Sequence, residues 1–298
     1  MKRVWLLVAA LTLLFGDEMK VCESEQDKMS GCVEKKYYDN GRLLYEVPYK
    51  NGKKEGRQRE YWDNRKLKSE VTYKADVKEG VEKEYYENGK LKIERFFKND
   101  KRDGEVRGYY QSGSVEFKVV FEDGKREGMF FVYFADGSVR HEVFFKNDKK
   151  EGVEKEYYSN GRLKYDGLNK NDVPNGLIRT YFSNGYLESE AVYEGGKRNG
   201  VLRDYDRHGK LWHEMHFVDD KLHGVFKEYY MDGGLKVQTE FQNGLKNGEG
   251  SMYDRSGNLI ISLVFRDDKA IGGKCGDGRV LTSAHLHAFL NGTMPSCD

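Results

Sequence analysis

The segment GVEKEYYENGKLK at residues 80–92 recurs almost unchanged as GVEKEYYSNGRLK at residues 152–164. The two copies differ only where Ser159 replaces Glu87 and Arg162 replaces Lys90. Two further glycines, Gly104 and Gly128, divide the interval between the copies into three equal steps, which predicts a repeat of about 24 residues. A fixed period of this length is the sequence signature of an array of small structural units.

Two residue types mark every copy of the repeat. A tyrosine recurs at this interval at Tyr37, Tyr61, Tyr85, Tyr109, Tyr133, Tyr157, Tyr181, Tyr205, Tyr229 and Tyr253. A glycine recurs at the same interval at Gly56, Gly80, Gly104, Gly128, Gly152, Gly176, Gly200, Gly224, Gly248 and Gly272. A second glycine series, from Gly41 to Gly257, is interrupted only at Arg65. The chain therefore predicts ten in-phase repeats over residues 33–272.

Each repeat has the pattern of a β-hairpin. In the copy that begins at Gly80, EYYENG is an expected strand ending in Asn88-Gly89, a dipeptide that favours a two-residue hairpin turn. KLKIERFF is the return strand, and the Gly56 series is expected to mark a bend where no side chain fits. A lone hairpin is marginal in water, so each unit must stack on its neighbours. The expected fold is all-β, an elongated array of about ten hairpins in a twisted antiparallel sheet or solenoid, with a short C-terminal capping helix.

The expected turn also predicts which charged residues face each other across a hairpin. Six pairs of opposite charge result: Lys35 with Glu46, Arg59 with Glu70, Lys83 with Glu94, Lys155 with Asp166, Arg179 with Glu190 and Arg203 with Glu214. Exposed pairs of this kind contribute little stability, so they select the register. A merely solvated charged face is an equal alternative.

Burial is expected to come from aromatic ladders. One set of rings follows the tyrosine series directly and comprises Tyr38, Trp62, Tyr86, Tyr110, Phe134, Tyr158 and Phe182. The other lies on the return strands and comprises Tyr49, Tyr73, Phe97, Phe121, Phe145, Tyr193, Phe217, Phe241 and Phe265.

The two ends of the chain differ from the repeats. Residues 1–16, MKRVWLLVAALTLLFG, have two cations followed by an apolar run too short to span a bilayer as a helix, which predicts a signal peptide; an uncleaved anchor is the alternative. The four cysteines lie near the ends, and the length of the array permits only Cys22 with Cys32 and Cys275 with Cys297. Residues 17–32 and 273–298 are therefore expected to be disulfide-stapled caps, the second with a helix that starts at Thr282 or Ser283 and ends before Gly292.

Composition and motifs argue against an enzyme. The 51 basic and 50 acidic residues leave a net charge of +1, which does not favour binding to nucleic acid. On a strand, His213 and His216 point to opposite faces and should not share a metal ion. No nucleophile, acid–base pair or phosphate-binding loop stands out, so we expect no catalytic residue, metal or cofactor.

The recurring motif YYxNGxL followed by GKxxG resembles the MORN variant repeat. Residues 37–41, Gly52-Lys53 and Gly56 carry the first copy of this motif. The resemblance implies a sheet of successive hairpins that acts as a scaffold or binding surface. Among proteins with this repeat, the chain is similar to the bacterial YwqK group, whose members are often described as antitoxin-like. Four residues depart from the pattern, namely Arg65, Asn169, Asp206 and Asp254, and local looseness is expected there.

These observations favour a non-enzymatic exported scaffold, periplasmic or at the bacterial cell surface, that binds a protein partner through an extended aromatic and charged β surface. One alternative is an antitoxin or immunity protein that binds a toxin. Another is a module that binds anionic lipid or polysaccharide through a basic column, and a third is a purely structural spacer. The candidate partner-binding residues of that column, which starts at Lys35, are Arg59, Lys83, Arg107, Lys155, Arg179, Arg203 and Lys227.

Overall fold

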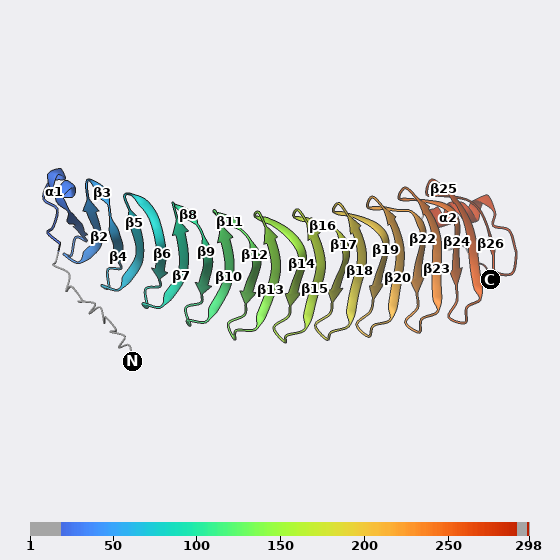
Figure 1. Ribbon diagram of the computed structural model, residues 1–298. Helices are drawn as coiled ribbons and strands as arrows, with labels where there is room; N and C mark the ends of the chain where they lie inside the picture. The colour runs from blue at the N-terminus through green and yellow to red at the C-terminus, as the bar shows by residue number, and fades with distance from the viewer. Residues whose placement is uncertain (1–18, 291–296, 298) are drawn as a thin grey trace, which may run out of the picture. The chain divides into compact units, whose positions relative to one another are not determined.

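The computed structural model describes residues 19–290 and residue 297, so the predicted signal peptide lies outside the described residues. The chain divides into two compact units, residues 1–113 and 114–298. Each unit is an antiparallel β-sheet in which successive hairpins lie side by side in chain order (Figure 1). The all-β repeat fold expected from the sequence is therefore confirmed.

Between residues 19 and 113, unit 1 contains one short helix and nine strands. They are α1 (Glu25–Ser30), β1 (Cys32–Tyr37), β2 (Leu43–Lys50), β3 (Lys53–Lys54), β4 (Gly56–Tyr61), β5 (Leu67–Lys74), β6 (Val77–Tyr85), β7 (Leu91–Lys98), β8 (Lys101–Arg102) and β9 (Gly104–Tyr109).

Unit 2 contains the remaining described strands and a terminal helix. The strands are β10 (Val115–Glu122), β11 (Lys125–Arg126), β12 (Gly128–Tyr133), β13 (Val139–Lys146), β14 (Lys149–Tyr157), β15 (Leu163–Lys170), β16 (Val173–Pro174), β17 (Gly176–Tyr181), β18 (Leu187–Glu194), β19 (Lys197–Tyr205), β20 (Leu211–Val218), β21 (Lys221–Leu222), β22 (Gly224–Tyr229), β23 (Leu235–Gln242), β24 (Leu245–Tyr253), β25 (Leu259–Arg266) and β26 (Lys269–Cys275). The helix is α2 (Ser283–Leu290).

The Asn-Gly segments do not form the expected two-residue turn. In the first hairpin, the Gly41 amide donates to the Tyr38 carbonyl and only Gly41, not Asn40, has a positive φ, at 75°. The turn therefore has three loop residues and ends in a bulge, in which Tyr37 pairs with Leu43. The Asn40 side chain closes the turn by accepting a hydrogen bond from the Arg42 amide at 3.1 Å.

Two-residue turns lie instead at the opposite end of each hairpin. Asn99 and Asp100 both have positive φ, at 50° and 62°, between the paired residues Lys98 and Lys101. A two-residue turn with both φ values positive matches the right-handed twist of the strands that flank it. Despite this exchange of turns, all six predicted charge pairs face each other, because the bulge lies between the turn and the charges.

The Gly56 series is required by backbone conformation more than by space. Gly56 itself has φ of 109°, and its Cβ would lie 3.2 Å from the Pro48 side chain. At Gly128 and Gly152, however, a Cβ would meet nothing within 4 Å, although φ is again positive at 93° and 80°. The expected bend is present, but the left-handed backbone explains the glycine better than crowding. Gly272 departs from the series, since it has no positive φ.

One face of the sheet, which we call the core face, buries two columns of return-strand side chains. One column includes Val47, Val71, Val119, Val143, Ala191 and Leu263, and the other includes Phe121, Phe145, Phe217 and Phe265. Val143 is only 1% exposed. The aromatic ladder expected from the sequence is therefore one half of the core, and small aliphatic side chains form the other half.

Cations cover several rings of the core face. Arg126 lies 3.9 Å from the centre of the Phe145 ring, and Arg198 lies 4.1 Å from that of Phe217. Lys54 and Lys78 cover Tyr73 and Phe97 in unit 1 in the same way. Such contacts hold charged side chains over apolar surface and contribute to the burial of each ring.

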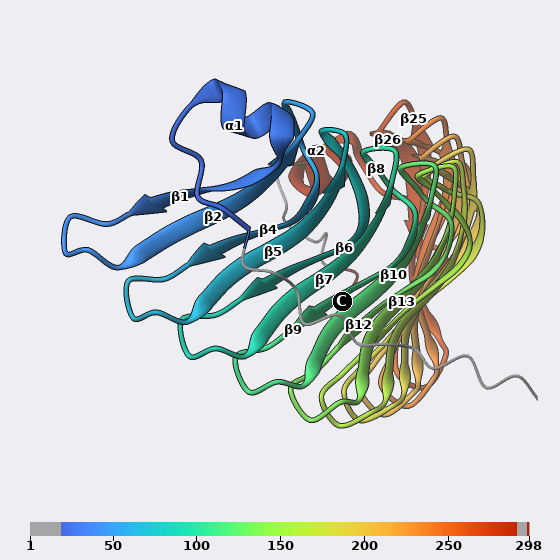
Figure 2. The same cartoon turned by 60° about the vertical axis from the view of Figure 1, so that its left-hand side comes forward.

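Both predicted disulfides are present. Cys22–Cys32 and Cys275–Cys297 have Cα separations of 5.2 and 5.6 Å. In unit 1, α1 covers β1 and β2 (Figure 2), and its first turn is closed by a reciprocal pair of bonds between Ser24 and Asp27. The sequence analysis did not predict α1.

The C-terminal cap also agrees with the sequence. The Thr282 hydroxyl accepts a hydrogen bond from the His285 amide at the start of α2, and Leu286 packs on the core formed by Ile261, Leu263 and Leu281. Neither helix of the described residues is long and apolar enough to cross a membrane.

Candidate functional site

The face opposite the core face, which we call the ladder face, carries alternating charges. Arg59 on β4 faces Glu70 on β5 and also bonds to Glu46 on β2, with 2.9 Å between Nη1 and Oε1. Farther along, Arg203 lies between Glu190, at 3.5 Å, and Glu214, at 2.9 Å. Each of these cations is thus held between a carboxylate of its own hairpin and one of the preceding hairpin.

The tyrosine series belongs to the same network. The Tyr61 hydroxyl donates to Glu46 at 3.0 Å, and the Tyr157 hydroxyl donates to Glu142 at 2.8 Å. Burial, and then the carboxylate, raise the pKa of Tyr157 to about 12. For Tyr85 the same two causes, the carboxylate being Glu70, raise the pKa to about 12. Tyr61, Tyr85 and Tyr157 therefore each tie their hairpin to the one before it.

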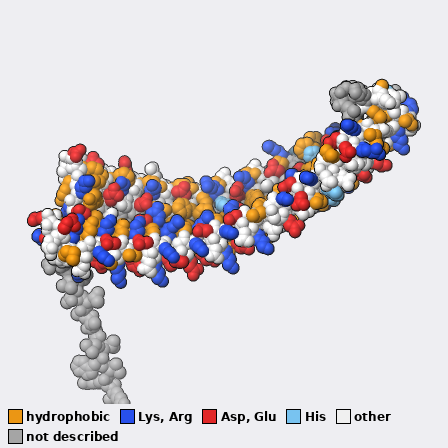
Figure 3. Space-filling model, turned by 90° about the horizontal axis from the view of Figure 1, so that it is seen from above, with side chains coloured by type: hydrophobic (Ala, Val, Ile, Leu, Met, Phe, Trp, Pro, Cys, Tyr) orange, Lys and Arg blue, Asp and Glu red, His pale blue; other side chains and the backbone are white. Residues whose placement is uncertain are grey.

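This network decides what the predicted partner-binding column presents to solvent. Lys83 lies 3.3 Å from Glu94, Arg107 bonds to Glu105, Arg179 lies between Asp166 and Glu190, and Lys227 lies 3.4 Å from Glu214. Lys155 faces Asp166 on one side and Glu142 on the other. The column is therefore interleaved with carboxylates and forms no continuous basic surface. Basic and acidic side chains also alternate over the face in view in Figure 3.

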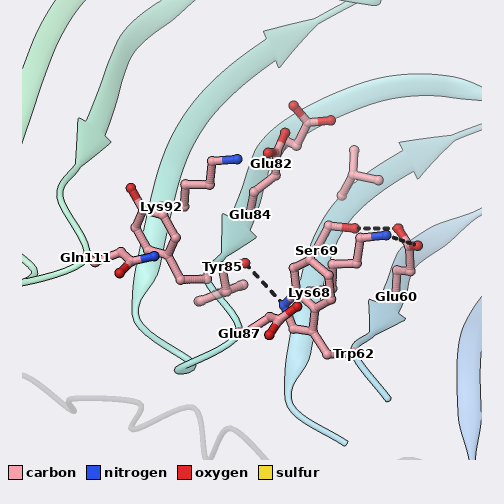
Figure 4. Close-up of a pocket in the computed structure, with 12 residues that line it drawn as sticks. Glu60, Trp62, Lys68, Ser69, Glu82, Glu84, Tyr85, Glu87, Lys92 and Gln111 are labelled. Atoms are coloured by element: carbon pink, nitrogen blue, oxygen red, sulfur yellow. Dashed lines mark hydrogen bonds and ion pairs between the residues drawn. The ribbon is translucent and has the colours of Figure 1, made fainter. Parts of the chain in front are cut away.

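A groove follows the three-residue turns on the core face, and we call it the turn groove. In unit 1 it contains a cavity of about 480 Å³ lined by Trp62, Tyr86, Lys68, Lys92 and Glu84 among others (Figure 4). Lys68 lies 5.0 Å from the Trp62 ring and bonds to Glu60 at 2.7 Å. The Trp62 indole donates to the Tyr85 carbonyl of the next hairpin, which fixes the ring.

The turn groove recurs in unit 2. A cavity of about 480 Å³ is lined by Phe134, Arg140, Glu156, Tyr158 and Lys164, which stand three repeats after Trp62, Lys68, Glu84, Tyr86 and Lys92. Equivalent side chains thus build the same hollow in different hairpins. The ring, cation and carboxylate of each hollow recur with the repeat.

Two residues break this pattern in one place. Asp206, like Asp254, stands where the other hairpins carry a ring, and Trp212 stands at the position of Lys92, Lys164 and Lys236. Here the turn groove widens to a cavity of about 540 Å³, which we call the Trp212 cleft. Phe182 and Tyr230, the rings before and after Asp206 in the series, both line it.

The expected looseness at three of the departures from the motif is absent. Asp206 accepts hydrogen bonds from the His208 and Lys210 amides, and Asp254 accepts from those of Ser256 and Asn258. These carboxylates close the turns as Asn40 does elsewhere. Asn169 is 7% exposed and donates to Glu154. Of the four departures, only Arg65 adopts a strained conformation, with φ of 68°.

Glu154 is the centre of a buried polar cluster on the core face of unit 2. Its carboxylate contacts His141 at 2.9 Å, Lys150 at 2.6 Å and Asn169 at 2.8 Å. Burial raises the pKa of Glu154, but these three hydrogen bonds outweigh it and lower the pKa to about 2. Each charged group in the cluster is therefore paired, and no group of three or more His, Cys, Asp or Glu within the described residues is arranged to hold a metal ion.

The ladder face of unit 2 also carries apolar side chains. Val120, Val153, Leu168 and Val192 are between 40% and 43% exposed. They belong to two facing columns, in which Met129 pairs with Phe144, Val153 with Leu168 and Leu177 with Val192. With Val201, these residues form what we call the apolar stripe. In unit 1 the equivalent pairs are Arg57 with Thr72, which is polar, and Val81 with Phe96, which is apolar.

Sequence reasoning missed both the Trp212 cleft and the apolar stripe. The repeat alignment contains a signal for each. Asp206 and Trp212 differ in residue type from their counterparts in the adjacent repeats, and the position of Leu168 is apolar in successive repeats, at Phe96, Val120, Phe144, Leu168 and Val192. The motif predicts looseness at Asp206, whereas in the structure this departure helps to form a cleft.

Comparison with known proteins matches a family model described as the MORN repeat variant. It matches residues 33–51, 54–75, 78–99, 102–123, 126–147, 150–171 and 222–243, which together make up half of the chain. Residues 172–221 and 244–272 lie outside the match, yet they form hairpins with the same register. No curated protein matches the chain.

Solved structures give only distant likenesses. The crystal structure of TcdB2-TccC3-Cdc42 is 13% identical over 83% of this chain and 15% of that chain, with a TM-score of 0.18. A porin-like protein from Bacteroides uniformis is 10% identical over 81% of this chain and 93% of that chain, with a TM-score of 0.15. The chain thus spans a small part of the first of these structures, and scores this low carry no argument about this protein.

Proposed function

Since the chain belongs to the MORN repeat variant family, we propose that it is a non-enzymatic, exported scaffold that binds a protein partner through the apolar stripe of unit 2. The observation that carries this proposal is the exposure of Val120, Leu168 and Val192, which share one repeat position, together with that of Val153, which pairs with Leu168. Contiguous apolar side chains on a soluble surface mark interaction sites.

The dimensions of the stripe suit a protein partner. Its eight residues lie on eight strands, β10, β12–β15 and β17–β19, and strands about 4.8 Å apart would extend the stripe over roughly 34 Å. This length is comparable to one side of a standard protein interface. The charges beside it are already paired on the ladder face, so contact with an apolar partner surface would leave few unpaired ions.

Two observations support export. Residues 4–15 are rich in apolar side chains and follow Lys2-Arg3, as in signal peptides, and the two disulfides are of a kind that persists in oxidising compartments. A periplasmic or cell-surface location follows if the source is bacterial. The antitoxin-like alternative differs only in that the partner would be a toxin.

The test compares the wild-type protein with a double variant, Val153→Arg and Leu168→Thr. These substitutions place on β14 and β15 the pair that Arg57 and Thr72 already form in unit 1, so the fold should be retained. Both proteins are used as bait against envelope extract at low and high salt, with mass spectrometry of what is retained. A protein retained by wild type at both salt concentrations and lost with the variant supports the proposal; equal retention by both baits contradicts it.

A further inference from the structure

The Trp212 cleft exists because two departures from the repeat coincide. Where Asp206 replaces a ring, the aromatic series along the turn groove loses one member between Phe182 and Tyr230. The small carboxylate leaves space that a ring would occupy. Trp212 replaces a lysine and supplies a flat surface in the same hollow. Asp254 departs from the ring series in the same way, but only the hairpin of Asp206 also carries a tryptophan at the position of Trp212. A structural role common to all repeats therefore does not explain this hollow.

The indole of Trp212 is held for stacking. It is 51% exposed, and its ring lies 4.3 Å from that of His213 at an interplanar angle of 25°. The His213 ring is in turn 5.7 Å from Phe226 on the core face. One face of the indole is thus supported from beneath, and the other is left for a ligand.

Charged groups surround the aromatic surface. The cleft is lined by four cations, Arg207, Lys210, Lys236 and Arg255, and two carboxylates, Asp206 and Glu228. Lys236 bonds to Glu228 at 2.6 Å, and Arg255 lies 3.6 Å from Asp232. Arg207 instead lies over the Phe182 ring at 5.8 Å, and Lys210 donates to the neutral Met231 carbonyl at 2.6 Å. The cleft therefore carries an excess of positive charge.

We infer that the Trp212 cleft binds an anionic saccharide, with a sugar ring on the indole of Trp212 and its carboxylate at Arg207 and Lys210. A pyranose has an apolar C–H face that packs on an aromatic ring and a rim of hydroxyl groups that both donate and accept hydrogen bonds. The cleft offers both kinds of partner, since Lys236 donates and Glu228 accepts. A cavity of about 540 Å³ is within the usual range for small-ligand sites.

Other ligands match the cleft less well. A quaternary ammonium ligand is itself a cation, so the excess of positive charge in the cleft would repel it. A nucleotide would stack on Trp212, but its phosphates would lie beside Asp206 and Glu228, and those carboxylates oppose a multiply charged anion. A uronic acid carries a single negative charge for each ring, and its hydroxyl groups use the carboxylates as acceptors. This inference is independent of the apolar stripe, which lies on the opposite face of the sheet.

The test is isothermal titration calorimetry of the purified protein with tetragalacturonate. Neutral cellotetraose and adenosine monophosphate are the comparison ligands. We expect saturable binding of tetragalacturonate that weakens with added salt, and at least tenfold weaker binding of cellotetraose. Tryptophan fluorescence should change on binding, and the change should persist in Trp62→Phe, which removes the tryptophan that lines the turn groove of unit 1.

Two variants restore the repeat and fill or flatten the cleft. Asp206→Tyr introduces the ring found at Tyr230, and Trp212→Lys introduces the residue found at Lys236. Each should weaken tetragalacturonate binding at least tenfold without affecting capture of a protein by the apolar stripe. The inference is overturned if neither saccharide binds, if adenosine monophosphate alone binds, if cellotetraose binds equally well, or if Trp212→Lys binds as wild type does.

Discussion

Arg59 bonds more closely to Glu46 of the preceding hairpin than to Glu70, which faces it within its own hairpin: the structure gives a 2.9 Å ion pair with Glu46, and Tyr61 joins the same carboxylate. The hydrogen bond that Arg59 donates to Glu46 raises the pKa of Arg59 above its ordinary value. Charges that seemed from sequence to choose the register of one hairpin therefore also connect successive hairpins.

The first prediction concerns Glu46. Glu46→Gln should destabilise unit 1 by about 1 kcal/mol, because the Arg59 and Tyr61 hydrogen bonds lose their ionised acceptor while both partners remain accessible to water. Hydrogen exchange of the β2 and β4 amides measures the effect locally. Glu87→Gln, on an exposed turn, is the matched control and should leave the exchange rates of these amides unchanged. Equal effects of the two substitutions would contradict a stabilising role for the bonds from Arg59 and Tyr61 to Glu46.

The second prediction concerns Glu154. Glu154→Gln should cost about 2–3 kcal/mol at neutral pH, since the amide loses the charge that pairs with Lys150 and replaces with an NH2 group the oxygen that accepts from Asn169. The pKa of Glu154 is lowered from 4.5 to about 2, so its contribution is fully present above about pH 4.5 and is lost as the pH falls towards 2.

Urea unfolding of wild type and Glu154→Gln across this range measures the difference. The difference in the free energy of unfolding between the two proteins should narrow as the pH falls from 4.5 towards 2. Exposed Glu188→Gln serves as the control, and its stability should follow that of wild type. A gap that is independent of pH would show that the carboxylate charge is not what stabilises the cluster.

The third prediction concerns Tyr157. Its pKa of about 12 lies above the ordinary value of 10, so the neutral hydroxyl stabilises the fold below pH 10 and this contribution is lost as the pH rises through 12. In Glu142→Gln the carboxylate no longer opposes ionisation, and the Tyr157 pKa should fall. Nuclear magnetic resonance titration of labelled tyrosine detects the shift, and an unchanged Tyr157 pKa would contradict the hydrogen bond to Glu142.

The fourth prediction concerns Arg65, the one residue in the second glycine series that is not glycine. Because its φ is 68°, Arg65→Gly should stabilise unit 1 by about 1 kcal/mol through relief of left-handed strain. The reverse substitution, Gly41→Arg, should destabilise by a similar amount, since φ is 75° there and a Cβ would meet nothing within 4 Å. Thermal unfolding measures both; effects of the same sign would contradict this explanation.

The sequence predicted the repeat, the strand register and the two disulfides because each depends on spacing alone. Arg59 faces Glu70, and Cys275 pairs with Cys297, as their positions along the chain require. The prediction that the two-residue turn lies at Asn88-Gly89 was wrong, since that turn lies at the opposite end of the hairpin. Asn99-Asp100 tolerates positive φ at both residues as well as Asn-Gly does, so local propensity did not distinguish the two ends.

The candidate sites were harder to predict because they depend on exceptions to the repeat. In the sequence, the basic column is a series of cations at one repeat position, which suggested a binding surface. Strand pairing places Glu46, Glu190 and Glu214 between its members. Asp206 was predicted only as a departure from the motif, and the three-dimensional neighbourhood of Phe182 and Tyr230 shows that it forms one cleft with Trp212. The sequence alone does not show that the Leu168 side chain is exposed on the ladder face.

The measurement that tests the central proposal most directly is hydrogen exchange of the protein with and without the partner captured by wild-type bait. We predict that the partner protects the amides of the strand segments around Val153, Leu168 and Val192 from exchange. We also predict that the Val153→Arg, Leu168→Thr variant does not bind the partner. Protection confined to unit 1, or binding that is unaffected by the double substitution, would contradict it.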